Sequence, residues 1–268
     1  RKLHPISHQG VCADVIATKD DIKRSDLESL ALESQKRAAQ AIKEGRFDKS
    51  VVPVYKEDGT LALDKEEYPR PNTSLESLEQ LAPAFTKLAD MPLDETGTTY
   101  KKLVQAAYPG FEIDHRHHAG TSSGIVDGAA VVLLASPEYA MKNGLKPRAK
   151  VRAVANAGAE PELMLTAPMP ATEKCLEKAG LNISDIDLFE VNEAFAVVPL
   201  KYMRDLDINP SKVNVNGGAM ALGHPIGATG AILLGTLLDE LERQQKTYGL
   251  VTLCTGGGQA PAMIIERM

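Results

Sequence analysis

The sequence predicts an α/β protein in which helices pack on both faces of a mixed, mostly parallel, five-stranded sheet, together with an irregular α+β region ahead of it. After Gly120, short runs of Val, Ile and Leu alternate with helical stretches, which is typical of strands joined by helical crossovers. Before Gly120 the chain is more polar and less regular. Its 268 residues are enough for one large domain or two small ones.

Composition and charge exclude several classes of protein. Hydrophobic residues make up 43% and charged residues 25%, which is ordinary for a soluble globular protein. A net charge of -6 argues against a broadly basic surface for nucleic acid or anionic membrane. The longest weakly polar run, residues 227–238, is too short to span a bilayer, and no secretory signal opens the chain. Three widely spaced cysteines do not suggest a disulfide framework and fit a reducing compartment.

Residues 20–46 have the pattern of an amphipathic helix. Ser25 and Glu28 have the spacing of a capping box, which predicts the start of the helix. The apolar residues that follow lie on roughly one helical face. They are Leu27, Leu30, Ala31, Ala38, Ala41 and Ile42. The paired charges of this stretch are most simply interpreted as a solvated face.

The next stretch, residues 47–85, is irregular. It contains a short strand candidate at residues 51–54, a turn at Asp58 and Gly59, and prolines among charges. A stretch this long and polar is more than a simple connection, so we interpret it as an excursion that covers another part of the molecule.

Three histidines flank Arg116, at positions 115, 117 and 118. A metal site is one interpretation, but neighbours in sequence rarely converge on one ion, and no Cys or carboxylate lies at a matching spacing. We favour a solvated or coenzyme-facing basic cluster.

The second part of the chain supplies the predicted sheet. An apolar run at residues 129–135 comes first. The predicted strands are residues 150–156, 186–191, 213–215, 249–254 and 262–266. Between them, a helix is predicted at residues 171–179, closed by Gly180, and a longer one at 227–243. Cys175 has helical spacing with Leu176 and Ala179, which indicates a buried packing residue.

Asn192, Glu193, Ala194 and Phe195 come directly after the strand that ends at Val191. Functional loops of such sheets lie at the carboxyl ends of strands. An Asn amide can donate two hydrogen bonds, and a neighbouring Glu can orient or hold a water. The alternative, with about equal weight, is that Asn192 is the N-cap of the next helix.

A glycine-rich stretch at residues 216–230 presents His224 in a turn before the long helix. Its glycines and proline suggest a backbone shaped for close approach. The spacing matches neither a dinucleotide-binding nor a phosphate-binding loop. A lone loop histidine is more often structural than catalytic, and the surrounding glycines make the two interpretations comparable.

Cys254 is followed by Thr255 and three glycines at the end of another strand. A free cysteine is usually an inert buried thiol. However, the amides of a triple-glycine turn can point at a developing negative charge, and a thiol beside a histidine and free amides is how cysteine chemistry is arranged.

Together these motifs resemble one family closely. Residues 192–195, 217–230 and 254–258 occur in the order and spacing of thiolases, which are acetyl-CoA acetyltransferases and 3-ketoacyl-CoA thiolases. The resemblance extends over essentially the whole chain. It implies a lid, or loop domain, at residues 1–119 and the end of an N-terminal half-domain at 120–147. The C-terminal half-domain is then residues 148–268.

The resemblance also implies residue roles. His224 would activate the nucleophilic thiol and, with a water held by Asn192, form one oxyanion hole. Cys254 would be the acid–base cysteine, and the amide of Gly256 would belong to a second oxyanion hole. Ser123 would contact the pantetheine–nucleotide portion of coenzyme A. Proton transfer by Cys254 requires a stabilised thiolate, which we expect a histidine and amide donors to provide.

The chain departs from the family in one respect. The family's acyl-accepting cysteine lies upstream of the lid in a Cys-x-Ser/Gly-Gly type motif, and these 268 residues contain none. Cys12 lies at a lid position and is a poor candidate. We therefore expect a fragment, a protein with its first part absent, or a half that pairs with another chain, and we expect this chain alone to be inactive and to leave an open apolar edge at residues 129–135.

The predicted function is thiolase-type acyl transfer: thiolytic cleavage of 3-ketoacyl-CoA, or Claisen condensation of acyl-CoA with acetyl-CoA, as in fatty acid β-oxidation. Coenzyme A and acyl-CoA are substrates, and no metal or other cofactor is expected. The alternative is a non-catalytic half that binds coenzyme A or acts as a scaffold. The resemblance further implies a homo-oligomer, dimer or tetramer, when the upstream segment is present, with no nucleic acid and no membrane span. We expect a cytoplasmic location, or the mitochondrial or peroxisomal matrix in a eukaryote.

Overall fold

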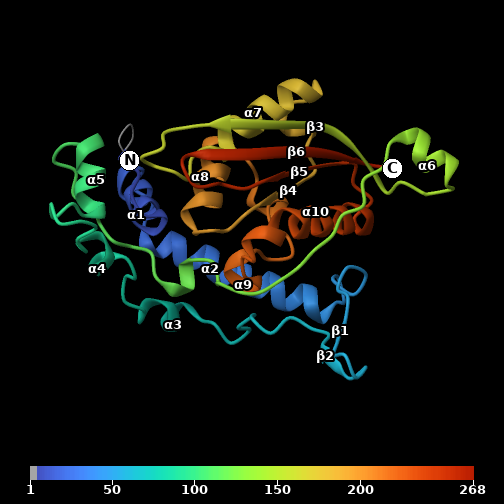
Figure 1. Cartoon of the computed structure of the whole chain (residues 1–268), viewed down its shortest axis with the longest axis horizontal. Helices are drawn as coiled ribbons and strands as arrows, with labels where there is room; N and C mark the ends of the chain where they lie inside the picture. The colour runs from blue at the N-terminus through green and yellow to red at the C-terminus, as the bar shows by residue number, and fades with distance from the viewer. Residues whose placement is uncertain (1–4) are drawn as a thin grey trace.

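The computed structural model describes residues 5–268 (Figure 1). The helices are α1 (Gln9–Lys19), α2 (Arg24–Lys43), α3 (Leu75–Glu79), α4 (Thr86–Ala89), α5 (Tyr100–Ala107), α6 (Pro137–Lys142), α7 (Pro168–Ala179), α8 (Val197–Asp205), α9 (Ala219–Leu222) and α10 (Ile226–Arg243). The strands are β1 (Val54–Tyr55), β2 (Leu61–Leu63), β3 (Ala149–Gly158), β4 (Leu188–Val191), β5 (Tyr248–Thr252) and β6 (Gln259–Arg267). No described helix combines the length and apolar composition that crossing a bilayer requires.

The main sheet has the order β3-β6-β5-β4 and is mixed. β4 and β5 are parallel, whereas β6 is antiparallel to both of its neighbours. The predicted α/β class with a mixed sheet is confirmed, but the sheet is less parallel than expected. The reason is the connection between β5 and β6, a tight turn with Gly257 and Gly258 at positive φ, which is far too short for a crossover. The predicted strand at residues 213–215 is reduced to isolated parallel bridges, from Val213 to Phe189 and from Val215 to Gly217.

Helices cover both faces of this sheet (Figure 1). On one face, α10 packs Leu233, Leu237 and Leu241 against the sheet residues Leu188, Val251 and Ile265. On the other face, the alternate strand residues join the main core together with α7 and α8. That core includes Phe189, Leu250, Ile264, Cys175 and Tyr202. Cys175 is fully buried, as its helical spacing predicts, and Gly180 ends α7 with φ of 66°.

The helices α1 and α2 lie beside the sheet and share its core, through residues such as Val11, Ile16 and Leu27. The predicted start of α2 is wrong by a few residues. The helix begins at Arg24, and the carboxylate of Asp26 accepts a hydrogen bond from the Lys23 amide at 3.1 Å. Glu28, expected in a capping box, is instead buried and bonds Arg24.

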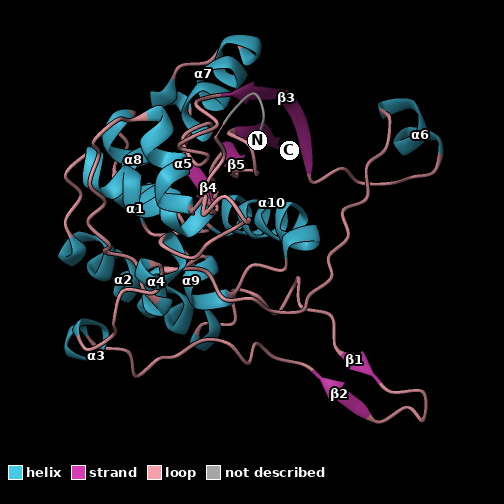
Figure 2. Cartoon of the chain, turned by 60° about the vertical axis from the view of Figure 1, so that its left-hand side comes forward, coloured by secondary structure: helices cyan, strands magenta, loops and turns pink. Residues whose placement is uncertain are grey.

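The excursion after α2 leaves the body of the molecule as the hairpin β1–β2 (Figure 2). Both strands are exposed over their whole length. The chain then returns past α3, α4 and α5 to the segment that contains Ser123. Beyond it, residues 129–135 form no strand and are exposed, with Val131 at 93% and Leu133 at 82%.

Candidate active site

Asn192 and Cys254 follow neighbouring parallel strands at the same edge of the sheet. The last residue of β4, Val191, is opposite the last residue of β5, Thr252. The main-chain N–H of Asn192 continues this register by donating to the Thr252 carbonyl at 3.1 Å. Cys254 lies two residues beyond β5 and is half-buried. The ends of these parallel strands thus bring residues 192 and 254 to the same edge of the sheet.

His224 lies between the short helix α9 and the start of α10. Its main-chain N–H donates to the Gly124 carbonyl at 2.9 Å. Its ring nitrogen Nδ1 lies 2.7 Å from Oγ1 of Thr229, and Nε2 lies 3.4 Å from the side-chain amide nitrogen Nδ2 of Asn192. The loop between α9 and α10 therefore brings His224 to the side chain that follows β4.

The neighbours of His224 select one tautomer. The Thr229 hydroxyl donates to the Pro225 carbonyl at 3.1 Å, so its oxygen is free to accept from Nδ1–H of His224. Nε2 is then an unprotonated acceptor facing the Asn192 amide. Burial lowers the pKa of His224, which also favours the neutral ring.

The Asn192 side chain is buried and does not cap a helix, because α8 begins only at Val197. The N-cap interpretation is therefore wrong. Its Oδ1 is buried and has no hydrogen-bond partner among the described residues. A buried acceptor without a partner is costly, so this atom is suited to a water or a substrate group.

The turn after Cys254 is tight and rests on a neighbouring loop. The Thr255 amide donates to the Gln259 carbonyl at 2.7 Å, and the Ala159 amide donates to the Gly258 carbonyl at 2.7 Å. A side chain at Gly258 would collide with Pro161. Gly256 is exposed, and its N–H bonds no acceptor within residues 5–268.

The Cys254 thiol differs from the sequence expectation. We expected neighbours that stabilise its thiolate, but burial outweighs the one backbone hydrogen bond and raises the pKa of Cys254 to about 12. The neutral thiol is the dominant form near pH 7. Cys12 is fully buried, with a pKa also raised to about 12, and its thiol lies 3.3 Å from the Glu162 carbonyl.

The segment around Ser123 lies between the two motif loops. The Ser123 amide donates to the Ala194 carbonyl at 3.0 Å, and the Gly124 amide donates to Ala219 at 3.4 Å. Gly124 also has no room for a side chain, because a Cβ would lie 2.1 Å from the ring of Tyr68. Backbone contacts thus join the segment of Ser123 and Gly124 to the loops of Asn192 and His224.

The sequence motifs suggested a water-orienting role for Glu193 and did not single out Asn214. The carboxylate of Glu193 is bonded to the protein: it accepts from Ser34 at 2.7 Å, from Asn214 at 3.0 Å and from the Met220 amide at 3.2 Å. Asn214 also makes two 2.8 Å hydrogen bonds to the main chain of Val191. Asn214 stands between Val213 and Val215, and a polar residue inside such a short strand-like run was the available signal.

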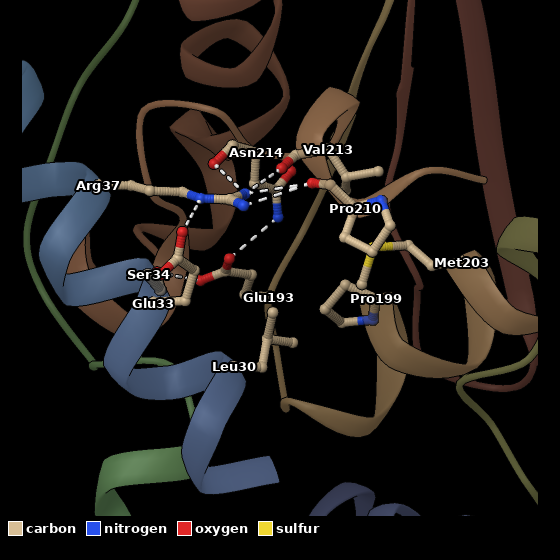
Figure 3. A pocket seen from close by; sticks show the side chains of 10 residues that line it. All are labelled: Leu30, Glu33, Ser34, Arg37, Glu193, Pro199, Met203, Pro210, Val213 and Asn214. Carbon is tan, nitrogen blue, oxygen red and sulfur yellow. Dashed lines mark hydrogen bonds and ion pairs between the residues drawn. The ribbon is translucent and has the colours of Figure 1, made fainter. Parts of the chain in front are cut away.

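A cavity of about 70 Å³ lies behind this network and not at the His224–Cys254 edge (Figure 3). Arg37 closes one side, paired with Glu33 at 2.7 Å and donating to the Val213 carbonyl at 2.6 Å. The polar side chains that line the cavity are thus bonded to each other, and we interpret the cavity as a packing defect behind Glu193. Neither His224 nor Cys254 lines it.

The histidine cluster is buried rather than solvated, which corrects the sequence interpretation. His117 and His118 are fully buried. Nδ1 of His117 lies 2.8 Å from Asp14, and Nε2 of His118 lies 3.0 Å from Glu28. No group of three metal-binding side chains occurs in the part of the chain that is described. These histidines therefore anchor the segment of residues 115–118 to α1 and α2.

Comparison with known proteins gives consistent matches. The family model of the thiolase N-terminal domain matches residues 2–90, and that of the thiolase C-terminal domain matches residues 145–267. The acetyl-CoA acetyltransferase of Escherichia coli (strain K12) is 42% identical over 263 residues, covering 97% of this chain and 60% of that protein. The beta-ketothiolase BktB of Cupriavidus necator is 40% identical, with the same coverage.

Solved structures are similar over the same extent. The Bacillus anthracis acetyl-CoA acetyltransferase aligns with a TM-score of 0.84 and 36% identity, covering 98% of this chain and 60% of that one. Human mitochondrial 3-ketoacyl-CoA thiolase aligns with a TM-score of 0.80 and 34% identity, covering 96% and 59%. The chain thus spans about 60% of the length of the relatives that it matches.

Proposed function

The chain belongs to the thiolase family, and from this premise we propose that it supplies the acid–base groups of a thiolase-type acyl transfer. The reaction is thiolytic cleavage of a 3-ketoacyl-CoA, or the reverse condensation of an acyl-CoA with acetyl-CoA. The observation that carries the proposal is the meeting of His224 and Asn192 at the sheet edge from which Cys254 also extends.

Cys254 is the proposed proton donor in cleavage. When the bond between C2 and C3 of the 3-ketoacyl group breaks, the electron pair stays on C2 of the departing acetyl-CoA, and this carbon needs a proton. A thiol with a pKa near 12 is protonated at neutral pH, which is the state that donation requires. In the condensation direction the same thiol must first lose its proton, so alkaline pH favours that step.

His224 and Asn192 are proposed to serve the thioester oxygen and the attacking thiol. In the neutral ring, Nε2 of His224 can take a proton from a thiol. Once protonated, Nε2 and a water held by Asn192 donate to the oxygen on which charge develops. The partnerless Oδ1 of Asn192 supports the presence of such a water.

Two further roles are proposed, for Gly256 and for Ser123. The exposed N–H of Gly256 is the proposed donor of a second oxyanion hole. Ser123 is proposed to contact coenzyme A, with the nucleotide end against the lid and the thiol end towards Cys254. A nucleotide bound against the glycine-rich residues 217–230 would contradict this arrangement.

The acyl group must be held on a thiolate between the two steps. Cys12 and Cys175 are fully buried, and the pKa of each is raised by burial, so neither suits this task. We assign it to the acyl-accepting cysteine that the family places upstream of the lid. The buried cysteines also favour the second candidate function, a half that binds coenzyme A without turnover.

Exchange of the α-protons of acetyl-CoA in deuterated water separates the two functions, because it needs the acid–base groups and no acyl carrier. We expect exchange that rises with pH and falls about 10²-fold or more in Cys254→Ser and in His224→Ala. Cys175→Ser is the matched control and should retain exchange. Calorimetric binding of coenzyme A with no exchange would instead support the scaffold function.

A further inference from the structure

Helix α2 of the lid packs directly on the loop that leads to His224. We call residues 213–224 the His224 loop. The two surfaces meet through buried polar groups, since Ser34, Gln35 and Asn214 are at most 8% exposed. Buried polar groups are costly unless bonded, so their partners report what this contact holds in place.

Ser34 joins the His224 loop to the Asn192 loop. Its hydroxyl oxygen accepts from the Gly218 amide at 3.0 Å, and its proton is donated to Oε2 of Glu193 at 2.7 Å. Glu193 directly follows Asn192, and its other oxygen accepts from Asn214 (Figure 3). The Met220 amide donates to the same oxygen as Ser34. The hydrogen bonds that Glu193 accepts favour its ionised form, whereas burial raises the pKa of this carboxyl.

Helix α2 and the His224 loop are closely packed at Gly217 and Gly218. A Cβ at Gly218 would lie 2.3 Å from the carboxyl carbon of Glu193. Gly217 has φ of 79°, and a Cβ there would lie 2.6 Å from the Ser34 carbonyl oxygen. Glycine is therefore required at both positions, and a shift of α2 must shift the His224 loop with it.

The neighbouring residue extends the connection into the lid. Nε2 of Gln35 donates to the Met220 carbonyl at 3.2 Å, and Oε1 accepts from the Arg70 amide at 2.8 Å. Arg70 lies where the chain returns from the hairpin excursion. One side chain of α2 thus bridges the lid's return and the His224 loop.

We propose that Ser34 is a positioning residue, which through Glu193 and Gly218 keeps Nε2 of His224 and the amide of Asn192 facing each other. The significance of this for catalysis rests on the proposed function. A merely structural role would affect the stability of the whole chain. A positioning role changes the His224 loop while the rest of the core stays intact.

Site-resolved amide hydrogen exchange, followed by NMR, and titration of His224 in the 268-residue chain test this proposal without any turnover. Ser34→Ala leaves the Gly218 amide and the Glu193 carboxylate each short of a partner. We expect exchange at Gly218 and Met220 to rise about tenfold or more, with β5 amides unchanged. The titration midpoint of His224 should rise towards 6.5 as the loop opens to solvent.

Ser29→Ala is the matched control, because Ser29 lies on the exposed face of α2 and bonds only the Ser25 carbonyl. It should change neither measurement. If Ser34→Ala does not fold, Ser34→Cys keeps the volume with a weaker donor and should show a smaller change of the same kind. Unchanged exchange and titration, or an equal loss of protection in β5, would overturn the proposal. A chain that shows the Ser34 response but no α-proton exchange would overturn the proposed function alone.

Discussion

The tautomer of His224 depends on two neighbouring side chains, Thr229 and Asn192. Thr229 is one turn into α10 and bonds Nδ1, while Asn192 approaches from the end of β4 and faces Nε2. The ring therefore keeps one tautomer, with its acceptor directed at the site. A threonine five residues after a histidine carries no signal in sequence, because its value depends on the turn that α10 makes after Pro225.

Thr229→Ala should reduce the α-proton exchange rate about tenfold, with little change in the affinity for coenzyme A. The physical reason is that Nδ1 loses its only side-chain partner, so the ring can rotate and adopt the other tautomer. Thr229→Ser keeps the hydroxyl and should restore most of the rate. Thr247→Ala, at an exposed position, serves as control. Equal rates in the Ala and Ser variants would contradict this role of Thr229.

His118, one of the two fully buried histidines, concerns stability. Nδ1 of His118 accepts from the Gly120 amide at 3.1 Å, so only Nε2 carries a proton, which it donates to Glu28. Burial lowers the pKa of His118 below 6.5 in the folded state. The unfolded chain therefore binds protons more readily, and stability present above pH 6.5 is lost as pH falls towards the folded pKa.

We expect the free energy of unfolding to fall between pH 7 and pH 5, and to fall less steeply in His118→Gln. Each unit by which a folded pKa lies below its unfolded value is worth about 1.4 kcal/mol. Denaturant unfolding at a series of pH values measures the slope. Parallel curves for the wild type and His118→Gln would show that His118 makes no contribution.

Residue partnerships mark the limit of what could be predicted from the sequence. The three motif loops could be placed at strand ends because strand order and loop position follow from local pattern. The burial of His117 and His118 could not, because their partners Asp14 and Glu28 lie about a hundred residues earlier. These carboxylate partners, which are distant in sequence, allow His117 and His118 to be buried.

At the scale of elements, the main helices α2, α7 and α10 lie where periodicity places them, within a few residues. The relative direction of the strands was predicted least well. Short apolar runs alternating with helices suggested parallel pairing, but the connection between β5 and β6 consists of a few residues with three glycines. Its length alone permits only an antiparallel pair.

The segment of residues 129–135 has the composition of a buried strand without a strand's partner among the described residues. Val131, Leu133 and Leu134 are each at least 70% exposed. Exposed apolar segments of high β-propensity are prone to association. The double substitution Val131→Lys and Leu133→Lys should therefore raise the concentration at which the chain stays dispersed, as light scattering measures.

These substitutions should leave the melting temperature almost unchanged, because surface changes away from special features are usually worth within about 0.5 kcal/mol. Val52→Lys, just before the hairpin, is the control, since Val52 is 78% exposed but lies outside this segment. If Val52→Lys improves solubility equally, added charge is the cause rather than the segment.

The whole molecule shows how helices α1 and α2 and the sheet depend on each other. Residues of α1 and α2 share the main core with β4, β5 and β6. The loop before α7 contacts both the Cys12 thiol and Gly258, so α1 and the turn after Cys254 rest on the same support. Helices that pack this way cannot be removed without loosening the sheet edge that carries residues 192 and 254.

The same arrangement predicts that the 268-residue chain alone cleaves no 3-ketoacyl-CoA. Thiolysis passes through an acyl-enzyme and needs a thiolate that can be acylated. Cys12 and Cys175 are buried, and Cys254 is assigned to proton transfer. Supplying a segment with the family's acyl-accepting cysteine, covalently or as a second chain, should give turnover, measured as loss of acetoacetyl-CoA absorbance. Turnover by the chain alone that survives Cys12→Ser but disappears in Cys254→Ser would show that Cys254 itself carries the acyl group, and the division of roles between donor and nucleophile would then be wrong.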